Sequence, residues 1–143
     1  MTEINFHTGM VDPLDYACRL LRKAQRSGAR VVVAGDPDLL DRLDALLWCF
    51  DPLEFIAHLR VPGGTVPAPH GEATPIWLAD DPSEAPHHEV LVNLGPEVIV
   101  GFESFQRLFE LVGLEPEERE AGRRRWQHFK TRGYPVVHQE VGA

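Results

Sequence analysis

Basic side chains and a tryptophan recur at helical spacing near the C-terminal end of this sequence. The stretch 122–132 holds five of the fourteen Lys and Arg residues and no Asp or Glu, which reverses the acidic balance of the rest. Three cations and one indole would project within about 60° of one another on an α-helix: Arg119, Arg123, Trp126 and Lys130. Guanidinium groups bind carboxylates through paired hydrogen bonds, and an adjacent indole can receive an apolar side chain. The stripe therefore predicts a site for a short acidic peptide with aromatic residues, and a solvated basic face is the alternative.

A second aromatic pair lies in the first half of the chain. Trp48 would share its helical face with Asp41 and Asp44, and Phe55 follows in the next loop. An indole among aspartates is expected to be at least partly exposed. Exposed aromatic side chains are typical anchors of protein interfaces. The pair predicts an interface, and ordinary burial under the next loop is an equally open alternative.

Fingerprints of nucleotide-binding and hydrolytic enzymes are missing from the sequence. A dinucleotide site needs G-x-G-x-x-G after the first strand, whereas residues 8–13 contain one glycine. Neither G-x-x-x-x-G-K-[ST] nor G-x-S-x-G occurs. Asp36 and Asp38 could hold a ribose or a metal ion, but aspartates at a helix start more often cap the helix. We expect no catalytic residue and no cofactor.

Metal ligands and disulfide bonds are not expected either. No two histidines have the i,i+4 spacing of a zinc site on a helix. Asp80 and Asp81 would face opposite ways on an extended segment. Cys18 and Cys49 form no C-x-x-C pair, and they are expected to be two buried thiols in a reducing compartment.

The bulk composition is that of one soluble globular domain. The chain has 143 residues and a formal net charge of −8, which argues against a whole surface that binds nucleic acid. Its apolar runs are too short to span a bilayer, and its first residues lack the apolar core of a signal peptide. These features predict a cytoplasmic protein without a membrane partner.

Strands and helices alternate along the chain, and proline follows a capping residue at two predicted helix starts. Helices are expected from Asp12-Pro13 to Gly28, from Asp36-Pro37 onward, over 102–112, and from Pro116 to about Thr131. Strands are expected at 3–8, 30–34, 75–79, 89–93, 98–100 and 134–137, with a loop at 62–75. This alternation predicts a single α/β domain over 1–143. Its sheet would be doubly wound and mostly parallel with helices on both faces, Rossmann-like but without a nucleotide fingerprint.

Four segments of the chain have a combination of residues that is typical of one family: RLDALLW at 42–48, FIAH at 55–58, HHEVLVNLG at 87–95 and RRRWQHFKTRGY at 123–134. They resemble the chi subunit family of bacterial DNA polymerase III, a clamp-loader accessory protein. With the spacing of the first strand and helix, the similarity covers essentially the whole chain. The resemblance implies an α/β fold of nucleotide-binding type with no catalysis.

The resemblance also implies two partners in the replisome. In the family, the last helix binds the acidic, phenylalanine-containing C-terminal tail of single-stranded DNA-binding protein. That site maps onto Arg119, Arg123 and Trp126, with Gln127 where the family has lysine. Trp126 replaces an aromatic hydroxyl. The chain would then meet single-stranded DNA only indirectly.

The second implied partner is the psi subunit of the clamp loader, or a helicase that competes for the same surface. In this family that surface surrounds the positions of Trp48 and Phe55. Two other functions stay open from the residues alone. One is a nucleotide-binding α/β enzyme, motivated by the alternating strands and helices. The other is direct single-stranded nucleic-acid binding, which would need a longer basic track.

Overall fold

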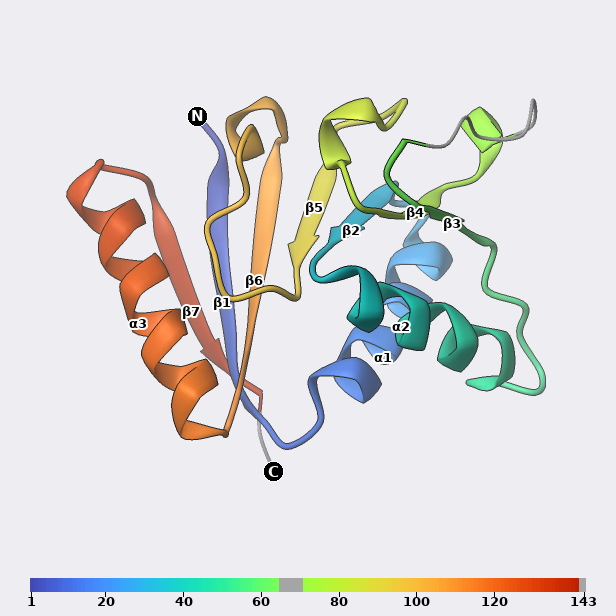
Figure 1. Cartoon of the computed structure of the whole chain (residues 1–143), viewed down its shortest axis with the longest axis horizontal. Coiled ribbons are helices and arrows are strands. Elements are labelled where there is room, and N and C mark those ends of the chain that lie inside the picture. Colours follow the sequence, from blue (N-terminus) through green and yellow to red (C-terminus); the bar gives the residue numbers. More distant parts are fainter. Residues whose placement is uncertain (65–70, 142–143) are drawn as a thin grey trace.

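The computed structural model describes residues 1–64 and 71–141, and it contains one parallel sheet with three α-helices (Figure 1). The strands lie in the order β3-β4-β2-β5-β6-β1-β7, and every pairing between neighbours is parallel. The strands are β1 Glu3–Met10, β2 Val31–Ala34, β3 His58–Val61, β4 Ile76–Ala79, β5 Val90–Asn93, β6 Arg107–Gly113 and β7 Val136–Glu140. The helices are α1 Pro13–Ser27, α2 Pro37–Cys49 and α3 Pro116–Thr131.

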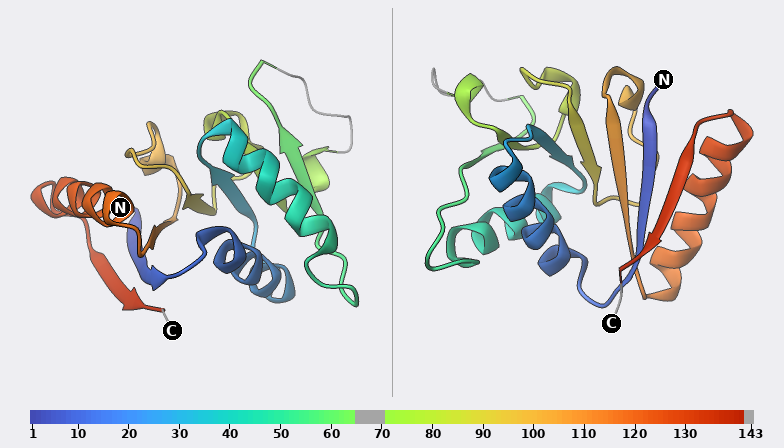
Figure 2. Two further views of the ribbon diagram at one scale, coloured as in Figure 1. Left: turned by 60° about the horizontal axis from the view of Figure 1, so that its bottom comes forward. Right: turned by 180° about the vertical axis from the view of Figure 1, so that it is seen from behind.

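Two apolar layers hold the helices on opposite faces of the sheet (Figure 2). On one face, Leu21 of α1 and Leu43 of α2 pack with strand residues such as Val33. On the other face, Phe129 of α3 packs with Phe6 of β1. The predicted fold class, a largely parallel sheet with helices on both faces, is confirmed. None of the helices in residues 1–64 and 71–141 is long and apolar enough to cross a membrane.

The capping residues start the helices where the sequence predicts them. The Asp12 side chain accepts hydrogen bonds from the backbone N–H groups of Leu14 and Asp15, and α1 begins at the following proline. Asp36 accepts from the N–H of Asp38 in the same way before α2. Gly28 ends α1 at φ 78°, a left-handed conformation that favours glycine.

The helix predicted over 102–112 is wrong. A short 3-10 turn, Phe102–Ser104, is followed there by β6, which lies between β5 and β1. Leu108 faces the α3 side and Leu111 the α1 side. A strand that is apolar on both faces produces a continuous apolar run, and that run mimics helical spacing.

Three strand predictions also need correction. Residues 98–100 form no strand. The edge strand β3, which pairs with β4, was not predicted. The last strand runs from Val136 to Glu140 rather than over 134–137. Of the loop expected at 62–75, residues 65–70 lie outside the described ranges, and Gly71–Ala73 form a 3-10 turn.

Candidate functional site

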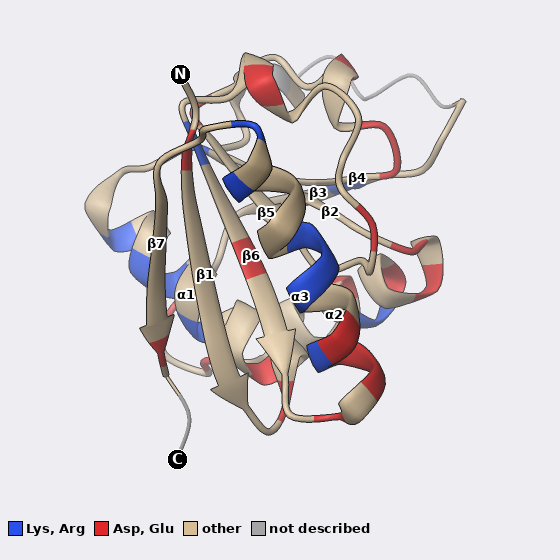
Figure 3. Cartoon of the chain, turned by 90° about the vertical axis from the view of Figure 1, so that its left-hand side faces the viewer, with Lys and Arg blue, Asp and Glu red and all other residues tan. Residues whose placement is uncertain are grey.

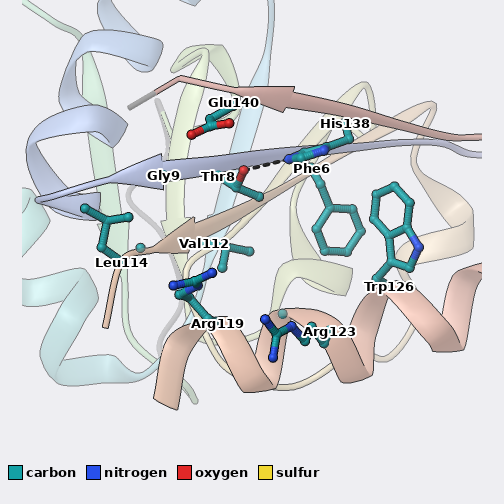
Figure 4. A pocket seen from close by; sticks show the side chains of 12 residues that line it. Phe6, Thr8, Gly9, Val112, Leu114, Arg119, Arg123, Trp126, His138 and Glu140 are labelled. Carbon is teal, nitrogen blue, oxygen red and sulfur yellow. Dashed lines mark hydrogen bonds between the residues drawn. The ribbon is translucent and has the colours of Figure 1, made fainter. Parts of the chain in front are cut away.

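A pocket of about 610 Å³ lies between α3 and the carboxyl ends of three strands (Figure 4). In parallel α/β sheets, ligands commonly bind at this end of the strands. One wall comes from α3, and the floor and the other wall come from the sheet. Its lining residues are Phe6, Thr8, Gly9, Val112, Gly113, Leu114, Arg119, Gly122, Arg123, Trp126, His138 and Glu140.

A glycine in α3 brings the helix close enough to the sheet to form the pocket. A Cβ atom on Gly122 would lie 2.9 Å from both Cγ atoms of Val112 in β6. Real Cβ atoms essentially never approach other atoms so closely, so a larger residue would displace either α3 or the Val112 side chain. The lack of a side chain at Gly122 therefore lets α3 lie this close to β6.

Trp126 forms the end of the pocket and is fixed on two sides. Its ring meets Phe6 edge to face with the centroids 5.1 Å apart, and the His138 ring lies 5.9 Å away. The Nζ atom of Lys130 lies 5.6 Å from the indole centroid, within reach of a cation–π interaction. The half-buried indole thus packs on the core and also faces the pocket.

Arg119 and Arg123 are exposed on the α3 wall, beyond the acidic first turn of the helix (Figure 3). Within residues 1–64 and 71–141, no carboxylate lies within ion-pair distance of either guanidinium group. Both side chains line the pocket, and Arg119 extends toward the strands (Figure 4). Two free guanidinium groups above an apolar floor can bind the carboxylates of a ligand.

The structure brings together only part of the predicted stripe. Arg119, Arg123 and Trp126 line the pocket, whereas Gln127 and Lys130 do not. Gln127 is exposed, and its backbone carbonyl accepts a hydrogen bond from the Thr131 hydroxyl. Lys130 reaches the site only through its contact with the indole.

The site predicted from the sequence does not include the residues that the strands contribute to the pocket. Phe6 pairs with His138, and Thr8 pairs with Glu140, in the parallel register of β1 and β7. The Thr8 hydroxyl and His138 Nε2 lie 2.7 Å apart. Alternation within each strand could have shown which residues share a face. No local signal shows that the first and last strands are neighbours.

A buried ion pair anchors α3 on the side away from the pocket. Arg125 Nε lies 2.9 Å from Glu110 Oε1, and both residues are almost fully buried. Asn93 donates to the same carboxylate oxygen at 2.8 Å, and Arg125 also donates to the carbonyl of Pro96. Burial raises the pKa of Glu110 to about 7, although the Arg125 charge opposes the rise. Arg125 therefore holds α3 against the sheet and is not available to a ligand in the pocket.

Trp48 and Phe55 form an exposed aromatic surface on the other side of the molecule. Their exposed fractions are 60% and 67%, and their ring centroids are 5.7 Å apart. The neighbouring Leu53 is 95% exposed. The Trp48 ring rests on His58, whose Nε2 lies 3.0 Å from Asp44 Oδ1. This arrangement presents three large apolar side chains to solvent.

The loop that carries Phe55 is tied to α1 by side-chain hydrogen bonds. The Gln25 amide donates to the Phe55 carbonyl and accepts from the Ala57 N–H, both at 2.7 Å. Arg26 binds both carboxylate oxygens of Glu54. A loop held in this way loses little further conformational freedom when a partner binds.

A second hollow lies at the carboxyl ends of β2, β4 and β5, where nucleotides bind in many doubly wound folds. Four of its lining residues are acidic, and none is Lys or Arg: Asp36, Asp80, Asp81 and Glu97. Nucleotide phosphates would therefore meet like charge here, which disfavours the nucleotide-enzyme alternative.

Metal ligands and cysteines add no further site among residues 1–64 and 71–141. No group of three or more His, Cys, Asp or Glu is placed there to hold a metal ion. Both cysteines are free thiols. Cys18 is buried, and burial raises its pKa to about 11. Cys49 is exposed, which corrects the expectation of two buried thiols.

A family model and a curated relative both match this chain. The family model described as "DNA polymerase III chi subunit, HolC" matches residues 1–137. The sequence is 33% identical over 141 residues to the DNA polymerase III subunit chi of Pseudomonas aeruginosa. That alignment covers 95% of this chain and 94% of the relative.

Proposed function

Because this chain belongs to the DNA polymerase III chi subunit family, we propose that it is a non-catalytic accessory subunit of the polymerase III holoenzyme. In this proposal, the pocket binds the acidic C-terminal tail of single-stranded DNA-binding protein. The chain thereby links the clamp loader to protein-coated single strands, and it works in the cytoplasm at the replisome.

One observation carries this proposal: two arginines that have no ion-pair partner among residues 1–64 and 71–141 lie over an apolar floor in a single pocket. Arg119 and Arg123 would bind the carboxylates of the tail. The floor, which includes Phe6 and Val112 and ends at Trp126, would receive its phenylalanine. The net charge of −8 for the whole chain disfavours a bare phosphate backbone as the ligand.

A peptide titration tests the tail site. Arg123→Ala is expected to weaken binding of a labelled acidic, phenylalanine-containing peptide about 10- to 100-fold. The reason is that a charged hydrogen bond contributes about 1.5–3 kcal/mol. Fluorescence anisotropy measures the dissociation constant, and raised salt should weaken binding of the wild type.

Arg124→Ala is the matched control for this titration. Arg124 is on the same helix but pairs with Glu120 in solvent, away from the pocket lining. Its loss removes the same charge and should change affinity little. Equal weakening by the Arg123 and Arg124 variants would show that the pocket is not the tail site.

We further propose that the surface formed by Trp48, Leu53 and Phe55 binds the psi subunit or a competing helicase. Two features support this assignment: the three apolar side chains are exposed, and the loop that carries Phe55 is hydrogen-bonded to α1. Buried aromatic anchors commonly contribute 2 kcal/mol or more at interfaces.

Co-purification tests this second surface. Trp48→Ala together with Phe55→Ala is expected to reduce capture of the psi subunit or helicase by roughly 30-fold or more, the equivalent of 2 kcal/mol. The same protein should still bind the tail peptide, and Arg123→Ala should show the reverse pattern. A folded double variant that still captures its partner fully would refute the assignment.

A further inference from the structure

The sheet wall of the pocket carries a carboxylate across from the two arginines of α3 (Figure 4). Glu140 lines this wall with His138, because alternate residues of a strand project from the same face. No ion pair joins Glu140 to Arg119 or Arg123 within the described part of the chain. The pocket therefore has a positive wall and a separate negative wall.

The position of Glu140 is fixed by the sheet and not by a loop. Its backbone pairs with Thr8 in the parallel register of β7 and β1. The Thr8 hydroxyl, which also lines the pocket, is hydrogen-bonded to His138. The exposed Glu140 carboxylate is thus free to interact with whatever enters the pocket.

We propose that Glu140 is a specificity-determining residue, which makes the pocket reject ligands that are negative on every side. This inference rests on the proposed function of the pocket. A ligand carboxylate beside α3 meets Arg119 and Arg123, whereas one beside β7 meets the like charge of Glu140. The favoured ligand is an acidic peptide that places its acids toward α3 and an uncharged or apolar side chain toward β7.

This charge arrangement distinguishes two classes of ligand that a basic helix alone would bind equally well. An acidic peptide with an apolar residue can keep its carboxylates away from Glu140. A uniformly charged chain, such as oligoglutamate or a phosphate backbone, cannot do so. Repulsion of the wrong ligand is a common source of specificity at interfaces.

Two labelled peptides of equal net charge test the proposal. One is acidic and contains phenylalanine, and the other is built from glutamate alone. In fluorescence anisotropy, Glu140→Gln is expected to improve binding of the glutamate peptide about three- to tenfold more than binding of the phenylalanine-containing peptide. The ratio of the two dissociation constants, glutamate peptide over phenylalanine-containing peptide, should fall by that factor.

Gln139→Lys is the matched control, because it changes the net charge by the same amount at the adjacent position, which faces the other side of the sheet. It should improve binding of both peptides by a similar factor. If Glu140→Gln also improves both equally, the role of Glu140 is overturned and the tail site stands. If the wild type does not bind the phenylalanine-containing peptide, the proposed function falls together with this inference. Circular dichroism verifies that both variants are folded.

Discussion

Replacing Arg125 with methionine is expected to lower the free energy of unfolding by about 3–5 kcal/mol at pH 8. Arg125 is 3% exposed and binds the fully buried carboxylate of Glu110. It also donates to the carbonyl of Pro96 at 2.9 Å. Methionine fills similar space without a charge or a donor, so the Glu110 carboxylate loses its counterion and the Pro96 carbonyl loses its donor. Urea denaturation followed by fluorescence measures the loss.

Two further variants separate this effect from a general effect of charge. Arg124→Met removes a guanidinium group from the same helix, but its partner Glu120 is exposed, and exposed pairs contribute about 0–1 kcal/mol. Adding Glu110→Leu to Arg125→Met removes the buried carboxylate and should restore most of the lost stability. Equal losses in the Arg124 and Arg125 variants would contradict a structural role for the buried pair.

The second large effect is a loss of stability as the pH rises, and it comes from Glu110. Burial raises the pKa of Glu110 from the ordinary value of 4.5 to about 7. Between these values the folded chain binds a proton that the unfolded chain releases, so this contribution is full below about pH 4.5 and is lost as the pH passes 7. From pH 5 to pH 8, the free energy of unfolding should fall by roughly 2–3 kcal/mol through this group.

Glu110→Gln isolates this contribution from those of other groups. Burial lowers the pKa of His7 and of His87, and these groups weaken the fold in the opposite direction, as the pH falls. The measured quantity is therefore the difference between wild type and Glu110→Gln in urea denaturation at pH 5, 6, 7 and 8. An identical pH dependence in both proteins would show that Glu110 does not hold the proton.

Helix starts could be predicted from sequence because their chemistry is local. Asp12 and Asp36 bind N–H groups two or three residues away, and the prolines that follow begin α1 and α2. The α3 wall of the pocket follows from the same kind of information, because residues three and four apart share a helical face. Arg119, Arg123 and Trp126 were placed together on this basis.

The buried position of β6 could not be predicted from spacing alone. Phe105, Leu108, Phe109 and Val112 fit the helical period, yet they precede or lie in a strand that is covered on both faces. An acidic residue in the middle of that run, Glu110, also resembles the polar face of a helix. Its partner Arg125 becomes visible only after α3 is packed on the sheet.

The sheet half of the pocket depends on contacts between distant parts of the chain. His138 and Glu140 reach the site because β7 pairs with β1, which lies at the other end of the sequence. The helical periodicity that placed Arg123 carries no information about that pairing. The α3 wall of the pocket could therefore be predicted from the sequence, whereas the sheet wall could not.

The position of β1 between β6 and β7 has a consequence for synthesis on the ribosome. The strand β1 is synthesised early, but its only neighbours in the described sheet, β6 and β7, are synthesised last. Until then, the apolar side chains of Ile4 and Phe6 lack the layer that buries them in the finished fold. Pairing of segments so far apart slows folding and prolongs exposure of apolar surface. The pocket should therefore be among the last features to form, after nearly the whole chain has been translated.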